Sequence, residues 1–352
     1  MDQTHTELRG FFAAANGYSG FRSYFSQIFD PKRFDKIYVL KGGPGTGKSS
    51  LMKRLRTVMK ENGYDVESML CSSDPKSLDG IIVSSGTGRV AVIDGTAPHE
   101  RDAMIPGAKD EIVPLGSLWD SRYLYGSKDK ICELSSAKSN AYQTAYSYLR
   151  IAGSADDAER NVMLSSFDKN SAKKHIKILA DNAFSLEYGN ISHRLISAFC
   201  KDGYVQSGTF DDEIITTLRI GGERKYAMHF IGQILQYLIG VGAQCTLLHS
   251  PFADDDLEGL YFKESDTLIT LTDSIECDVN ADEFFSLLPD EGERIRVAGQ
   301  LRGYALDEAA RWFGIASDLH FRLEKIYTAA MCFEKIDGVY DRLLIEMTDV
   351  LK

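Results

Sequence analysis

The sequence predicts an α/β protein with a parallel sheet core that is duplicated in tandem, each lobe carrying a helical appendage. Three observations predict this fold. They are a glycine-rich loop between a strand and a helix, a second apolar strand that ends in a carboxylate, and a weak internal match at an offset of 179 residues. The length of 352 residues suits two domains rather than one.

The strongest signal is the glycine loop. Residues 37–40 form an apolar, β-rich run, and Gly42-x-x-x-x-Gly47-Lys48-Ser49 follows at once, which is the P-loop (Walker A) pattern of nucleoside triphosphatases. Glycines allow successive backbone N–H groups to turn around phosphate oxygens, and the N-terminus of the helix that follows adds a partial positive charge. The pattern therefore predicts a P-loop NTPase-like core that binds a nucleoside triphosphate.

The loop also assigns roles to single residues. Lys48 can reach the β- and γ-phosphates, and the Ser49 hydroxyl can bind Mg²⁺. Guanine specificity would need an Asn-Lys-x-Asp motif, which the sequence lacks, so ATP is the expected nucleotide. The residues expected to bind it are Gly42, Gly43, Pro44, Gly45, Thr46, Gly47, Lys48, Ser49 and Ser50.

A second strand predicts the metal site. Residues 89–94 are an apolar run that ends in Asp94, as a Walker B strand does, and a carboxylate there can bind Mg²⁺. We therefore expect Asp94 to act with Lys48 in catalysis and with Ser49 as a metal ligand. The next residue is Gly95, where many P-loop ATPases carry a water-activating glutamate. The catalytic base must then come from elsewhere, or hydrolysis is slow.

Asp74 is the remaining catalytic candidate. It follows a predicted strand at 64–71, and it could orient a water molecule or accept a hydroxyl proton. The alternative reading is a turn residue ahead of Pro75. The sequence does not decide whether this strand lies between the P-loop strand and the Asp94 strand.

The second half resembles a degenerate copy of the first. Residues 34–96 align without a gap to 213–275, and Asp94 falls on Asp273. In this register Tyr226 and Ala227 replace the last glycine and the lysine of the P-loop, so the second lobe should not bind ATP. We expect it to remain as a packing partner. Two states of Arg224 stay open, a solvated side chain or one supplied to the first lobe.

These patterns divide the chain into four segments. Helical spacing of apolar residues marks two of them, and the internal match marks the other two. The predicted segments are an active P-loop lobe (1–120), a helical appendage (121–182), a degenerate P-loop-like lobe (183–299) and a C-terminal helical segment (300–352).

Charge and composition exclude several classes of protein. The net charge is −11, and it is uneven, with +4 over residues 1–180 and −15 over 181–352, so nucleic acid is not an expected partner. The N-terminus shows no secretion signal, and the uncharged stretch 230–248 reads as a helix and a strand instead of a membrane span. We expect a cytoplasmic protein whose partner, protein or small molecule, is unknown, and a homo-oligomer stays open.

Four runs resemble an uncharacterised bacterial family of tandem P-loop ATPases: GYSGF (17–21), KGGPGTGKSS (41–50), CSSDPKSLDG (71–80) and VIDGTAPH (92–99). The resemblance is closest over about residues 10–120. It implies a nucleotide-binding fold and ATPase activity with no established substrate, and by position it points to Lys48, Ser49, Asp74 and Asp94. Members of the family often keep a P-loop in both lobes, whereas this chain keeps one.

Three functions remain open from the sequence. The first is a Mg²⁺-dependent ATPase with a single active site per chain. The second is a kinase that passes the γ-phosphoryl group to a small molecule or nucleotide, with Asp74 as the base. The third is an ATP-dependent binding or scaffold protein with negligible turnover. The absence of a glutamate after Asp94 favours the second and third.

Overall fold

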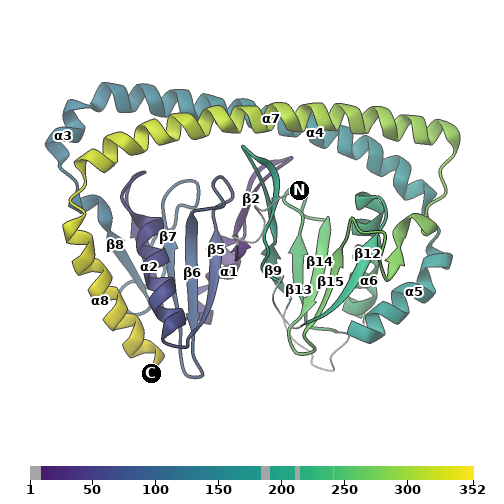
Figure 1. The fold of residues 1–352 in the computed structure, drawn as a ribbon, viewed down its shortest axis with the longest axis horizontal. Coiled ribbons are helices and arrows are strands. Elements are labelled where there is room, and N and C mark those ends of the chain that lie inside the picture. The colour runs from purple at the N-terminus through teal and green to yellow at the C-terminus, as the bar shows by residue number, and fades with distance from the viewer. Residues whose placement is uncertain (1–8, 184–190, 211–214, 241) are drawn as a thin grey trace.

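One sheet of twelve strands runs through both halves of the chain (Figure 1). The computed structural model describes residues 9–183, 191–210, 215–240 and 242–352. Three predicted features lie partly outside the described residues. They are the active lobe at its first eight residues, the degenerate lobe at its start after residue 183, and the internal match at 213–214. The expected α/β class is confirmed.

Six strands make the first half of the sheet. They are β1 (Phe11–Phe12), β4 (Lys36–Lys41), β5 (Asp65–Leu70), β6 (Leu78–Ser84), β7 (Arg89–Asp94) and β8 (Asp110–Pro114), and their spatial order is β1-β5-β6-β7-β4-β8. β4 pairs in parallel with β7 and β8, and residues 37–40 are almost completely buried. The open question of strand order is thereby answered, because β5 lies beyond β6 and not between β4 and β7.

The second half of the chain forms the other six strands of the same sheet and repeats this order, counted outward from the junction of the halves. Its strands are β9 (Ser192–Leu195), β12 (Thr216–Gly221), β13 (Thr246–His249), β14 (Leu257–Phe262), β15 (Thr267–Leu271) and β16 (Val279–Asn280), in the order β9-β13-β14-β15-β12-β16. The halves join where Phe12 of β1 pairs with Leu195 of β9 in antiparallel register.

The sheet is mixed, although most of its pairings are parallel. Six of the eleven pairings are parallel, and β6 and β14 run antiparallel to both of their neighbours. The expectation of a wholly parallel core is corrected in this respect. The connections 71–77 and 85–88 are too short for the crossover that a parallel pair needs, so β5, β6 and β7 form hairpins.

Smaller elements complete each half. Two hairpins leave the sheet, β2 (Ala14–Gly17) with β3 (Gly20–Ser23) and β10 (Ser197–Cys200) with β11 (Gly203–Gln206). Helices α2 (Lys48–Glu61) and α6 (Arg224–Gly240) pack on the sheet, and α1 (Phe25–Ile28) and the 3₁₀ helices η2 (Pro31–Arg33), η3 (Leu115–Leu118) and η4 (Ala281–Phe284) lie in connections. Within the described residues, no helix is long and apolar enough to cross a bilayer.

Two long antiparallel helices cross above both halves (Figure 1). The short α3 (Ser121–Gly126) precedes α4 (Lys128–Ser166), which is about 58 Å long. α7 (Pro289–Ala330) is about 63 Å long and lies along α4. α7 therefore begins inside the range predicted for the degenerate lobe. Buried residues recur at helical spacing where the two helices meet, and small alanines let them approach closely. The buried residues are Ala141, Ala145, Leu149, Ala152, Ala305, Ala309, Phe313 and Ala316.

Each long helix carries the chain to the other half. α4 ends beside the second half, where α5 (Lys169–Ala183) packs on α6. α7 returns to the first half, where α8 (Glu334–Leu351) packs on α2 and β7. An isolated β-bridge lies at each place where the chain passes between a long helix and one half: Trp119 pairs with Met331, and Phe167 pairs with Phe285. The last helix of the chain therefore belongs to the core of the first half.

This packing predicts that α8 stabilises the first half. Leu343 and Met347 are completely buried in the core of that half, while Ile345 on the same helix is 63% exposed. Leu343→Ala should lower the free energy of unfolding by about 2–5 kcal/mol, because it leaves a cavity between α8 and the sheet. Urea denaturation measures this, with Ile345→Ala as the matched control. An equal effect of the two substitutions would contradict the packing of α8.

Candidate functional site

The glycine-rich loop, residues 42–47, connects β4 to α2 at the carboxyl end of the sheet. Gly45 and Gly47 have φ angles of 68° and 81°, a left-handed conformation that side chains with a Cβ rarely adopt. Thr46 is buried, and its hydroxyl donates to the Gly43 carbonyl at 2.9 Å. The loop is therefore a fixed turn that only this glycine pattern allows.

Lys48 is the first residue of α2, and its side chain folds back over the loop. Its Nζ donates to the carbonyls of Gly42 and Gly43 at 2.9 Å each, and it lies 3.6 Å from Asp94 Oδ2. The Lys48 side chain is 11% exposed. Its two short hydrogen bonds are to neutral carbonyls, and an anion that enters the loop would offer the ammonium group a stronger, charge-assisted partner.

Asp94 ends β7, the strand beside β4, and its Cα is opposite that of Leu40. Its Oδ1 accepts hydrogen bonds from the backbone and the hydroxyl of Thr96 at 2.8 and 2.5 Å, which leaves Oδ2 to face Lys48. Ser49 Oγ accepts from Leu78 N at 2.9 Å and keeps a second lone pair. The Asp94 carboxylate and the Ser49 hydroxyl are oxygen groups of the kind that can bind Mg²⁺.

Asp74 stabilises its own turn. It lies exposed in the connection from β5 to β6, and its carboxylate accepts from Ser77 Oγ at 2.7 Å and from Lys76 N at 3.4 Å. Its charge acts on two residues of α7: it opposes the lowering of the His320 pKa by burial, and it adds to the effect of burial in raising the pKa of Glu324. Asp74 therefore lies near the same edge of the sheet as the loop, held in a turn of its own.

The structure adds residues from α7 that the sequence did not reveal. A Cβ placed on Gly45 would lie 2.5 Å from Thr328 Oγ1 and 2.7 Å from the Glu324 carbonyl oxygen. A Cβ on Gly43 would lie 3.2 Å from the ring of Tyr327. The last turns of α7 thus pack directly on the glycine-rich loop. These residues are some 280 positions away in sequence, and only the helical spacing of the C-terminal segment indicated a helix there.

Two ionisable side chains of α7 lie in this contact. Burial, with Lys138 and Lys48, lowers the pKa of His320 to about 4, so its imidazole is neutral near pH 7. Burial and Asp74 raise the pKa of Glu324, while the Gly45 backbone and Lys48 oppose that rise. His320 Nε2 and Glu324 Oε1 are 3.8 Å apart. A carboxylate and a neutral imidazole therefore face the loop.

The second half has no such loop. Only residues 222–223 separate β12 from α6, which begins at Arg224. The gapless alignment is therefore wrong at this point, since Tyr226 and Ala227 belong to the helix and not to a loop. Tyr226 stacks on Phe285 with ring centroids 4.0 Å apart, and Ala227 is buried.

Arg224 is not supplied to the first half, and its side chain, which is 36% exposed, is held in an ion pair of the second half. Its guanidinium donates to Glu258 Oε1 at 2.7 Å and to the Tyr204 hydroxyl at 2.5 Å. Glu258 is 2% exposed, and burial raises its pKa against the opposing effect of Arg224. Arg224, Glu258 and Asp273 line a cavity of about 200 Å³. The expectation that Arg224 is supplied to the first half is thus wrong, because the buried carboxylate of Glu258 holds it, and the side chain is only partly solvated.

The next residue, Lys225, is held by α4. Its Nζ lies 2.6 Å from Asp156 Oδ1 and also pairs with Glu159, and both carboxylates are buried. Arg160 on the same helix pairs with Asp256 at 2.7 Å. The start of α6 is therefore covered by α4 through fixed ion pairs, whereas the start of α2 is covered by α7.

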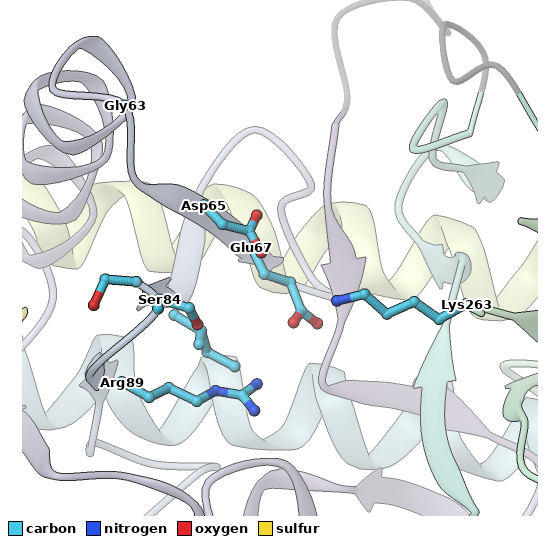
Figure 2. Close-up of a pocket in the computed structure, with 9 residues that line it drawn as sticks. Gly63, Asp65, Glu67, Ser84, Arg89 and Lys263 are labelled. Carbon is cyan, nitrogen blue, oxygen red and sulfur yellow. The ribbon is translucent and has the colours of Figure 1, made fainter. Parts of the chain in front are cut away.

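A larger cavity of about 470 Å³ lies in the middle of the sheet, at the end where β5 and β7 begin (Figure 2). Asp65, Glu67, Arg89 and Lys263 point into it from both halves of the chain. Arg89 begins β7, whose other end carries Asp94, so this cavity is remote from the glycine-rich loop. Glu67 is already paired with Arg194 at 2.6 Å. The larger cavity and the glycine-rich loop therefore lie at different ends of the strands.

Comparison of the chain with protein-family models, with curated proteins and with solved structures found no match.

The pair formed by Arg224 and Glu258 predicts a pH-dependent loss of stability. Arg224→Met should lower the free energy of unfolding by about 3 kcal/mol at pH 8, because it leaves a buried carboxylate unpaired. A buried carboxyl with a raised pKa binds more protons in the folded state, so stability rises as the pH falls and the deficit should be smaller at pH 5. Urea denaturation at both values measures this.

Arg296→Met is the control, because Arg296 forms an exposed pair with Glu293. It should leave the free energy of unfolding nearly unchanged at either pH, because water screens an exposed ion pair. A deficit of Arg224→Met that grows toward pH 5 would contradict the buried-pair interpretation.

Proposed function

We propose that this protein binds ATP with Mg²⁺ at the glycine-rich loop and hydrolyses it at one active site per chain. The observation that carries the proposal is the position of Lys48, which begins a helix directly after the loop and lies 3.6 Å from Asp94 at the end of the neighbouring strand. A cation on a glycine turn beside a carboxylate is the arrangement that a triphosphate and its metal require.

The residues of the loop would hold the phosphates. The N-terminus of α2 presents unpaired backbone N–H groups and a partial positive charge at the end of the loop, with Ser49 and Ser50 in its first turn. Lys48 would leave the Gly42 and Gly43 carbonyls for phosphate oxygens, which give a stronger, charge-assisted hydrogen bond. Pro44 and Thr46 would keep the turn closed.

Mg²⁺ would lie between Ser49 and Asp94, where it would neutralise charge on the phosphates. Asp94 is held by Thr96 through Oδ1 alone, so Oδ2 can exchange Lys48 for a metal or a metal-bound water. The Ser49 hydroxyl keeps its hydrogen bond from Leu78 N and offers its other lone pair.

We also infer that both halves have a P-loop NTPase-like core and that they arose by duplication. The repeated strand order, the antiparallel β6 and β14, and the matching crossings at Trp119 and Phe167 support this inference. In the second half the short connection at 222–223 and the ion pairs of Lys225 leave no phosphate loop. One ATP per chain follows.

Lys48→Ala should abolish detectable MgATP binding in calorimetry, where wild type should bind one equivalent per chain. The reason is the loss of the cation that directly follows the loop, since Lys48 is the only Lys or Arg in residues 42–50. Lys60→Ala is the matched control, because Lys60 is exposed at the far end of the same helix. Affinity of Lys48→Ala within threefold of wild type, or a second equivalent in wild type, would refute the proposed site.

Asp94→Asn should keep measurable ATP binding but lose most of its dependence on Mg²⁺. An amide fits in place of the carboxylate and can still accept from Thr96, yet it lacks the charge that holds the metal. Phosphate release at increasing Mg²⁺ concentrations measures this change, and turnover should fall by at least tenfold. Undiminished turnover would move the metal role to another residue.

A further inference from the structure

Hydrolysis of ATP needs a group that takes a proton from the attacking water, and Asp94 is followed by Gly95. The structure explains why no glutamate can stand there. A Cβ on Gly95 would collide with the Val39 side chain and lie 3.0 Å from the Arg101 carbonyl oxygen. The group must therefore come from another element that reaches the glycine-rich loop.

Helix α7 is that element. The Glu324 carbonyl oxygen lies 2.7 Å from the position of a Cβ on Gly45, so the helix backbone itself touches the loop at this residue. Thr328, one turn later, donates to the Gly45 carbonyl at 3.4 Å. The Gly45 backbone and Lys48 both oppose the rise that burial causes in the pKa of the Glu324 carboxyl, so this side chain lies near the loop.

Asp74 and His320 also lie near the loop, but they suit the role of proton acceptor less well. Asp74 is exposed and already accepts hydrogen bonds from Ser77 and Lys76. His320 lies within 3.8 Å of Glu324, but an imidazole flanked by Lys48 and Lys138 is a weak base. Glu324 combines a negative charge, partial burial and direct packing of its helix on the loop.

We propose that Glu324 is the general base for the hydrolysis of ATP at this site, a role that rests on the proposed function. Its carboxylate accepts a proton from water as the water oxygen bonds to the γ-phosphorus. The bond from the γ-phosphorus to the bridging oxygen breaks, and ADP leaves with that electron pair. The proton then passes from Glu324 to the released phosphate, which restores the carboxylate.

This assignment gives the second half of the chain a part in the chemistry. Glu324 lies near the end of α7, a helix that starts in the second half and crosses above the sheet to reach the first (Figure 1). α8 follows at once and packs in the core of the first half, where the Tyr38 hydroxyl donates to Glu346 at 2.9 Å. The active site is therefore completed by a segment from the half that has lost its own loop.

The test compares three variants with wild type for MgATP affinity by calorimetry and for phosphate release. Glu324→Gln keeps the shape of the side chain and removes the charge, Glu324→Asp keeps the charge on a shorter side chain, and Glu293→Gln is the control on the same helix. Glu293 is 60% exposed near the start of α7. Glu324→Gln should lower kcat at least 100-fold with the Kd for MgATP within threefold of wild type.

The dependence of kcat on pH gives a readout that a purely structural role would not move. Glu324 must be ionised to act, so wild-type kcat should fall as the pH drops through its raised pKa. The groups facing it are Lys48 from α2, Asp74 from the connection after β5, His320 on α7, and Lys138 from α4 beside His320. The residual kcat of Glu324→Gln should not show this fall at low pH. Glu324→Asp should recover part of the wild-type kcat.

Two outcomes would overturn the role of Glu324 while leaving the proposed function intact. One is phosphate release by Glu324→Gln within threefold of wild type. The other is tighter MgATP binding by this variant with kcat unchanged, which would show that Glu324 only blocks the loop. A wild type that binds no ATP would refute the proposed function and this role together, and one that binds ATP without turnover would refute catalysis.

Discussion

The antiparallel contact between α4 and α7 is the constraint on which the rest of the structure depends. Alanines at 141, 145, 305 and 309 allow the two helices to lie close together above the sheet. Because the helices run in opposite directions, each delivers the chain to the half in which it did not begin. α5 then packs on the second half and α8 on the first. Separating the two halves would therefore remove a helix from the core of each.

The same contact decides what lies over the start of α2 and of α6. At α6, Asp156 and Glu159 of α4 hold Lys225 in ion pairs that leave the lysine no free role. At α2, α7 presents Glu324 and a neutral His320 to Lys48, whose closest partners are the carbonyls of its own loop. One architecture thus forms a closed charge network at the start of α6 and, at the start of α2, the loop that we propose binds an anion.

The part of the candidate site that could be predicted from the sequence is the part encoded locally. Gly42 to Ser49 require glycine at two left-handed positions, and the loop, strand and helix are adjacent in the chain. Asp94 is recognisable because it ends an apolar run. Glu324 was not predictable, because a carboxylate on a helix surface has no local signature and its partner loop is about 280 residues away.

The misread parts of the fold have physical reasons as well. A buried strand reads as the same apolar run in either direction, so the antiparallel β6 could not be told from a parallel strand. The gapless match hid the short connection at 222–223, because few identities fixed its register. Ion pairs such as that of Arg224 with the buried Glu258 were not recognisable, because their two members are distant in the sequence.

The central claim is that one nucleotide site is built by the loop of the first half and by α7 from the second. A crystal structure with a non-hydrolysable ATP analogue and Mg²⁺ tests it most directly. The account predicts the triphosphate along residues 42–50, the metal at Ser49 and Asp94, and the Glu324 carboxylate within hydrogen-bonding distance of a water beside the γ-phosphate. An analogue bound beside Lys263 or Arg224 with the loop empty, or one in the loop with Glu324 turned away, would contradict it.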